Sequence, residues 1–168
     1  MPAGLRLIIR TDGAAKGNPG PASSGAVLID ATQPGARDPL ARPLATISEY
    51  LGIRTNNVAE YVGVVRALAL ALELGATEVD LLLDSKLIVE QVNGRWRVKD
   101  LKIVPLYTEV RGSLGRFRRW TANHVPRAQN SAADALANEA IDRVRAGGPP
   151  VVVRRPDRPS AVPGPGGA

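Results

Sequence analysis

The sequence predicts an α/β fold: a mixed five-stranded sheet, with three antiparallel strands first and parallel strands after them, flanked by helices. Two patterns predict it. The first 53 residues contain three segments rich in β-branched residues and leucine, separated by segments that contain glycine and proline. From residue 58 onward, apolar residues at helical spacing alternate with short apolar strands. Strands joined through helices run parallel with right-handed crossovers, so the predicted order is βββαβααβα.

The N-terminal part supplies the three consecutive strands, which we place at residues 5–11, 24–30 and 44–53. Asp12-Gly13 is a turn-forming pair, and we expect the first strand to stop there. A turn over residues 13–21 and a proline-containing loop over residues 31–43 then join the strands into an antiparallel meander.

The rest of the chain supplies the helices and the parallel strands. Apolar residues at three- and four-residue spacing predict the first helix over 58–72, and Gly75 ends it. The same reasoning predicts the remaining elements: a strand at 79–83, helices at 87–92 and 101–114, a strand at 117–125 and a closing helix at 132–145.

We place one folded domain at residues 1–146. Residues 147–168 contain six prolines and five glycines, a composition typical of a disordered Pro/Gly-rich tail or a truncated linker. The run of valines at 151–153 is the one segment there that suits an edge strand.

Composition restricts the possible chemistry. The chain has no cysteine and one histidine, which excludes disulfides, thiolate zinc sites and multi-histidine metal sites. A metal would have to be held by carboxylates, which favours a hard cation such as Mg²⁺ or Mn²⁺. No segment approaches the roughly 18 apolar residues of a membrane span, and the N-terminal apolar run is too short for a signal peptide. We therefore expect a cytoplasmic protein with no membrane partner.

The net charge of +6 is concentrated in one region. Residues 95–120 contain eight basic and two acidic residues, together with four of the six aromatic residues. Basic charge interleaved with aromatic residues suits a nucleic-acid surface. The alternative is a solvated basic face whose aromatic residues belong to the core.

Four segments carry a more specific signal: TDGAAKGNPGPASSGAVL at 11–28, TNNVAEY at 55–61, LLLDSKLIVEQVNG at 81–94 and HVPRAQNSAADALANEA at 124–140. In this order and spacing they resemble type I ribonuclease H, in the compact bacterial and archaeal form that lacks the basic protrusion. The resemblance implies the ribonuclease H-like fold. It also implies endonucleolytic hydrolysis of the RNA strand of RNA–DNA hybrids by two Mg²⁺ ions, for which Mn²⁺ can substitute, with 5′-phosphate and 3′-hydroxyl products.

The resemblance carries the metal-binding carboxylates of that family onto Asp12, Glu60, Asp84 and Asp134. Each also has a structural alternative: Asp12 as a turn residue, Glu60 as an exposed helix charge, Asp84 as a helix N-cap and Asp134 as part of a capping box. Converging carboxylates repel one another, and a pair of divalent cations would cancel that charge and clamp a phosphodiester for in-line attack.

Further roles follow from the same resemblance. His124 would move protons or help to release product. The 2′-hydroxyl of RNA would be contacted by Gly13, Asn18, Asn56 and Asn57, whereas Thr55 would hold a phosphate of the DNA strand. Ser85 and Lys86 would face the RNA strand. The alternatives are ordinary turn and capping chemistry for the residues of the first turn and helix, and a backbone hydrogen bond for His124.

Two other functions remain open: a catalytically inactive hybrid-binding module, and a DNA-directed nuclease of the same fold. The first would be expected to lose some of the four carboxylates, and the second to lack the Thr-Asn-Asn and Gly-Asn-Pro-Gly pieces. We expect a monomer. A C-terminal fused domain, phosphatase-like as in some bacterial relatives, is expected if the tail is a linker.

Overall fold

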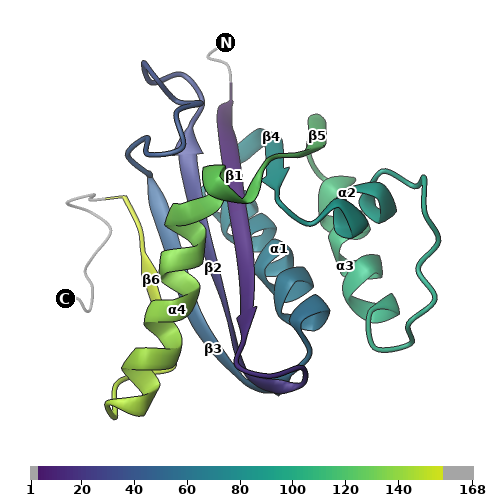
Figure 1. Ribbon diagram of the computed structural model, residues 1–168. Helices are drawn as coiled ribbons and strands as arrows, with labels where there is room; N and C mark the ends of the chain where they lie inside the picture. Colours follow the sequence, from purple (N-terminus) through teal and green to yellow (C-terminus); the bar gives the residue numbers. More distant parts are fainter. Residues whose placement is uncertain (1–3, 157–168) are drawn as a thin grey trace.

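A computed structural model describes residues 4–156. The predicted α/β fold is confirmed, and a single mixed sheet forms its centre (Figure 1). The strand order across the sheet is β5-β4-β1-β2-β3-β6. The strands are β1 (Leu5–Ala15), β2 (Gly20–Asp30), β3 (Ala45–Arg54), β4 (Ala76–Leu83), β5 (Arg119–His124) and β6 (Val151–Arg154). β1, β2 and β3 form the antiparallel meander, β4 and β5 run parallel to β1, and β6 is antiparallel to β3.

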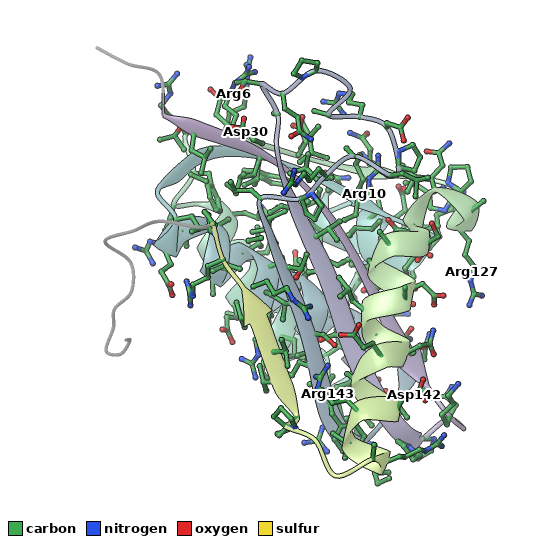
Figure 2. The ribbon with its side chains drawn as sticks, turned by 90° about the vertical axis from the view of Figure 1, so that its left-hand side faces the viewer. Arg6, Arg10, Asp30, Arg127, Asp142 and Arg143 are labelled. Carbon is green, nitrogen blue, oxygen red and sulfur yellow. The ribbon has the colours of Figure 1, made fainter. Side chains whose placement is uncertain are left out.

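The helices cover both faces of the sheet. On one face α1 (Asn56–Glu73) packs against β1 and β2, and α2 (Lys86–Val92) and α3 (Val104–Leu114) lie beside α1 (Figure 1). On the other face α4 (Ser131–Arg145) crosses β2 and β3, preceded by a short 3₁₀ helix, η1 (Arg127–Asn130) (Figure 2). No helix within residues 4–156 combines the length and apolar character needed to cross a membrane.

The two faces have separate apolar cores, and β1 contributes to both. Leu7 and Ile9 belong to the larger core with α1, α2 and α3, whereas Ile8 belongs to the smaller core on the side of α4. Because successive side chains of a strand alternate between faces, this register directs residue 12 toward α4 and residue 13 toward α1. β1 therefore presents consecutive residues to two different helices.

The first strand is longer than we predicted. Asp12 and Gly13 do not form a turn: they pair with Gly25 and Ser24 of β2, and β1 continues to Ala15. The turn comes later, where the Lys16 amide donates to the Pro21 carbonyl at 2.8 Å. Pairing with β2 and cover from helices on both faces outweigh the local turn preference of an Asp-Gly pair.

The prediction of five strands is wrong by one, because β6 adds to the outer edge of β3. The segment predicted to be a tail thus begins with an ordered strand of β-branched valines. Arg143 of α4 holds the connection in place: its guanidinium donates to the carbonyls of Pro149 at 2.6 Å and Pro150 at 3.3 Å, and to the Ser48 carbonyl of β3 at 2.9 Å (Figure 2). The rest of the predicted tail, residues 157–168, lies outside the described residues.

Candidate metal-binding active site

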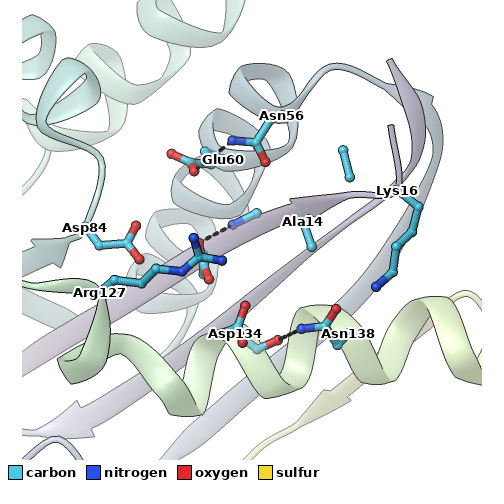
Figure 3. A pocket seen from close by; sticks show the side chains of 11 residues that line it. Ala14, Lys16, Asn56, Glu60, Asp84, Arg127, Asp134 and Asn138 are labelled. Atoms are coloured by element: carbon cyan, nitrogen blue, oxygen red, sulfur yellow. Dashed lines mark hydrogen bonds between the residues drawn. The ribbon is translucent and has the colours of Figure 1, made fainter. Parts of the chain in front are cut away.

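Three of the four predicted carboxylates converge at the middle of the sheet. An oxygen of Asp12, one of Glu60 and one of Asp84 all lie within 4.8 Å of one another. β1 and β4 are parallel neighbours with Thr11 opposite Leu83, so the next residue of each chain segment brings Asp12 and Asp84 side by side. Glu60 reaches the same point from the first turns of α1 (Figure 3).

Gly13 allows α1 to approach the strand this closely. A Cβ at Gly13 would lie 2.5 Å from the Glu60 nitrogen and 2.8 Å from the Ala59 carbonyl carbon. Real Cβ atoms do not tolerate such distances from backbone atoms, so only glycine lets the helix lie directly on β1 at this point. The glycine next to Asp12 in sequence therefore sets the position of Glu60 in space.

Asp134 lines the same pocket from the opposite side, on α4 (Figure 3). A second close approach places it there, since a Cβ at Gly25 of β2 would lie 2.2 Å from the Ala133 carbonyl oxygen. Asp134 is not one of the three carboxylates that meet within 4.8 Å. The structure thus gathers all four predicted acids around a pocket of about 410 Å³: three lie within 4.8 Å of one another, and Asp134 lies next to Asp12, where a side-chain hydrogen bond between the two acids helps to raise the Asp12 pKa.

The structural alternatives for these acids find no support in the hydrogen bonding. Asp12 lies within a strand, not in a turn. Ser85, not Asp84, is the N-cap of α2, and its hydroxyl accepts from the Ile88 amide at 3.3 Å. The capping-box alternative for Asp134 needs Ser131 as the N-cap of α4, but Ser131 is the first residue of the helix and the N-cap is Asn130, which makes no side-chain capping bond.

The acids perturb one another strongly. Burial, followed by the neighbouring charges of Asp84 and Glu60, raises the pKa of Asp12 to about 8. Burial and the Asp84 charge raise the pKa of Glu60 to about 7. Burial also raises the pKa of Asp84, although Arg127 acts against it. Among residues 4–156, no ion pair includes any of the four acids.

This cluster fits a hard divalent cation. Its donor atoms are carboxylate oxygens, the ligands that Mg²⁺ and Mn²⁺ prefer. Without a cation the negative charges can be relieved only by protons, which is what the raised pKa values express. Asp12, Glu60 and Asp84 are the residues that would hold such an ion, with Asp134 available next to Asp12.

These pKa shifts predict how the stability of the metal-free protein depends on pH. The folded chain keeps a proton on Asp12 that the unfolded chain, with an ordinary carboxyl pKa of 3.8, releases. The contribution of Asp12 to the free energy of unfolding in EDTA should therefore be fully present below about pH 4, decrease as the pH rises toward 8, and then level off. Added Mg²⁺ should raise the melting temperature more at pH 8 than at pH 6. Thermal melts across this range check both trends, and a Mg²⁺ effect that does not grow with pH would contradict the assignment.

The predicted substrate-binding residues of the first turn and helix also have structural roles. The Asn18 side-chain carbonyl accepts from the Asn56 amide at 3.0 Å, and the Thr55 hydroxyl accepts from the Val58 amide at 3.3 Å. The Asn56 side-chain amide donates to Glu60 at 3.2 Å. The β1–β2 turn is thereby fixed to the start of α1, with Asn56 on the wall of the pocket. Asn57 is exposed.

The remaining predicted residues lie close to Asp84. A hydrogen bond from Ser85 acts to lower the pKa of Glu60, and Lys86 is exposed at the start of α2. His124 is the last residue of β5, opposite Leu83. It is exposed and does not line the pocket, but it is near enough for its charge to act on the pKa of Asp84.

Sequence reasoning missed three polar residues of the pocket wall: Lys16, Arg127 and Asn138 (Figure 3). Arg127 comes from η1, which is anchored to β1 by Asn130, whose side-chain amide donates to the Thr11 carbonyl at 2.7 Å. These are single polar residues in turns or on a helix face, with no periodicity or spacing that marks them. Arg127 lies within segment 124–140, so the family resemblance of that segment is the one signal in the sequence that marks its neighbourhood as functional.

Comparison with known proteins places this site in a family. A family model described as "Reverse transcriptase-like" matches residues 10–140. Ribonuclease HI of Halobacterium salinarum is 39% identical over 139 residues, which cover 83% of this chain and 66% of that protein. The crystal structure of RNase H1 from this archaeon superimposes with a TM-score of 0.74, covering 82% of this chain and 98% of that one.

The chain belongs to the type I ribonuclease H family. Another relative is Bifunctional protein Rv2228c of Mycobacterium tuberculosis, 44% identical over 138 residues. The match covers 82% of this chain but 36% of that relative, and the solved N-terminal RNase H domain of Rv2228c is covered completely, with a TM-score of 0.75. LC11-RNase H1, solved in complex with an RNA/DNA hybrid, is 38% identical with a TM-score of 0.72; the match covers 83% of this chain and 99% of that one.

Proposed function

We propose that this chain hydrolyses the RNA strand of RNA–DNA hybrids. The observation that supports it most directly is the convergence of Asp12, Glu60 and Asp84 within 4.8 Å in an open pocket, in a type I ribonuclease H. The relative LC11-RNase H1, whose solved structure contains an RNA/DNA hybrid, supports the choice of substrate. An acid cluster without a cation has no evident structural use, because its charges destabilise the fold.

In the proposed reaction Asp12, Glu60, Asp84 and Asp134 would hold two Mg²⁺ ions, for which Mn²⁺ could substitute. Bound divalent cations supply an activated water and charge stabilisation for the departing 3′ oxygen. Attack on phosphorus then leaves a 5′-phosphate and a 3′-hydroxyl. The contribution of the protein is to hold the four carboxyl groups close together and oriented toward the scissile phosphate, whereas bound cations would keep these groups ionised.

Residues around the pocket suit the recognition of a hybrid. Lys16 and Arg127 line it and present positive charge for backbone phosphates. Asn18 and Asn56 present amide groups on the side of the β1–β2 turn, where they can read the 2′-hydroxyl that distinguishes RNA from DNA. His124, exposed beside the acids, is placed to exchange protons with solvent.

A second contact surface is the loop of residues 94–99 between α2 and α3. Its Trp96 is 45% exposed, and Arg97 and Lys99 are exposed beside it. Arg118 and Arg119 are less suitable. They lie at the start of β5, at the opposite end of that strand from His124, and Glu78 lies 3.6 Å and 3.9 Å from their guanidinium groups. We therefore assign the loop of residues 94–99, and not the arginines before β5, to binding the hybrid backbone.

A substrate panel tests the proposal. The purified chain with Mg²⁺ or Mn²⁺ is given the same sequence as labelled hybrid, duplex RNA, duplex DNA and single strands. We expect cleavage of the RNA strand of the hybrid, loss of activity in EDTA, and phosphatase-sensitive 5′ ends. Comparable cutting of duplex DNA would favour the DNA-directed alternative, whereas tight hybrid binding without cleavage would favour the inactive binding module.

A further inference from the structure

A buried polar chain joins α1 to the loop of residues 94–99. The Tyr61 hydroxyl donates to the side-chain carbonyl of Gln91 at 2.6 Å. The side-chain amide of Gln91 donates in turn to the main-chain carbonyl of Arg97 at 3.3 Å. Tyr61 is 1% exposed and Gln91 is 7% exposed. One buried hydrogen bond and one partly buried hydrogen bond therefore connect α1, α2 and the loop, which lie on the same face of the sheet (Figure 1).

The two ends of this chain lie at the two parts of the proposed substrate site. Tyr61 directly follows Glu60 in α1. A shift of α1 that moves Tyr61 therefore also moves the Glu60 carboxylate of the acid cluster. Arg97 is the centre of the basic loop, between Trp96 and Lys99. A hollow of about 590 Å³ lies against this loop, lined on its far side by Val104, Tyr107 and Thr108 of α3.

Val98 of the loop also packs against the larger apolar core, and the remaining hydrogen bonds of the loop lie at its start and near the surface. The Arg95 guanidinium donates to both carboxylate oxygens of Glu90, at 2.9 Å and 2.8 Å, and the Arg95 and Trp96 amides donate to the Glu90 carbonyl. Such exposed contacts hold a chain weakly. The Gln91 amide reaches the middle of the loop from the core, where a hydrogen bond is stronger and more directional than in water.

We propose that Gln91 and Tyr61 are positioning residues, which fix the basic loop relative to the acid cluster and so set the affinity for the hybrid without touching it. The inference rests on the proposed function. An apolar pair would fill this space equally well but would not fix the direction of the loop. A fully satisfied polar pair specifies one arrangement, and a pair that loses one partner leaves a buried polar atom unsatisfied.

The test uses Gln91→Leu and Tyr61→Phe in the whole chain. For Gln91→Leu we expect the Kd for hybrid, measured by fluorescence anisotropy in EDTA, to rise about threefold to tenfold, the loss expected for one buried hydrogen bond. The turnover number at saturating hybrid should stay within about twofold, because the acids remain in place. The slope of log Kd against log salt should become shallower by about one, since one phosphate contact is lost. Tyr61→Phe should give the same changes, but smaller, since the Gln91 bond to Arg97 remains.

Ser48→Ala serves as the matched control. The Ser48 hydroxyl is buried and donates to the Leu136 carbonyl at 2.7 Å, on the α4 side of the sheet and away from the loop. Its loss should lower the melting temperature but leave the Kd and the salt slope unchanged. If Gln91→Leu changes only the melting temperature while the parent chain binds and cleaves hybrid, the inference is overturned and the proposed function stands. A parent chain that neither binds nor cleaves hybrid overturns both.

Discussion

Asp12→Asn is expected to reduce hybrid cleavage by roughly a thousandfold or more, which corresponds to about 4 kcal/mol of lost transition-state stabilisation. Asp12 lies between the other acids: its pKa responds to Asp84, Glu60 and Asp134 together. An amide keeps the shape of the side chain but removes the charge that a bridging cation ligand needs. Cleavage assays at saturating hybrid and Mg²⁺ measure the effect, and the Kd for hybrid in EDTA should change by less than about threefold, because a carboxyl group has no positive charge with which to neutralise a phosphate.

Asp12→Asn should increase the stability of the metal-free protein, although it lowers the activity. Burial and neighbouring negative charge disfavour the ionised Asp12 carboxylate, so a neutral amide removes a cost. In EDTA at pH 8 the melting temperature of Asp12→Asn should therefore exceed that of the parent, and the stabilisation by Mg²⁺ should shrink. Asp142→Asn, an exposed change on α4 outside the pocket, is the control and should alter neither quantity. Cleavage by Asp12→Asn near the parent rate would refute its role as a metal ligand.

The residues of the acid cluster were accessible from the sequence because each lies in a segment with its own signature. Asp12 lies in the segment at 11–28 and Glu60 in the segment at 55–61, both of which resemble the family, and Asp84 directly follows an apolar strand. Their arrangement in space was not accessible in the same way. Asp134 lies next to Asp12 but outside the group of three acids that meet within 4.8 Å, and this position depends on how closely α4 packs against Gly25, which is a contact between distant segments.

For the fold, too, the elements set by local sequence patterns could be predicted, whereas those set by tertiary contacts could not. Helical periodicity over 58–72 predicted the body of α1, and apolar runs predicted the interior strands. Two errors arose where composition and tertiary context disagree. The Asp12-Gly13 pair has turn chemistry but is held in β1 by β2, and a proline- and glycine-rich segment contains β6, because three valines meet the free edge of β3. The valines at 151–153 suit an edge strand, but whether either segment pairs depends on its partner strand and not on its own residues.

Gly13→Ala is the second change with a large expected effect. It disturbs the packing of α1 against β1 without removing any of the proposed metal ligands. The new methyl group would lie 2.5 Å from the Glu60 nitrogen. Backbone cannot yield as a flexible side chain can, so α1 must move away from β1. We expect a loss of about 1–3 kcal/mol in the free energy of unfolding. Because a misplacement of about 1 Å can cost on the order of a hundredfold in rate, cleavage should fall far more than the fraction of folded protein does.

Gly112→Ala provides the contrast. Gly112 lies in α3 with no atom within 4 Å of an added Cβ, so alanine there should raise the free energy of unfolding by about 0.5–1 kcal/mol through better helix propensity and leave cleavage unchanged. Urea unfolding and single-turnover cleavage at a temperature where both variants are fully folded separate the two effects. If Gly13→Ala loses stability but retains the parent rate, then Glu60 does not depend on this close approach for its position. In that case the acid cluster would remain active with α1 displaced, and Gly13 would not be required to position the Glu60 carboxylate.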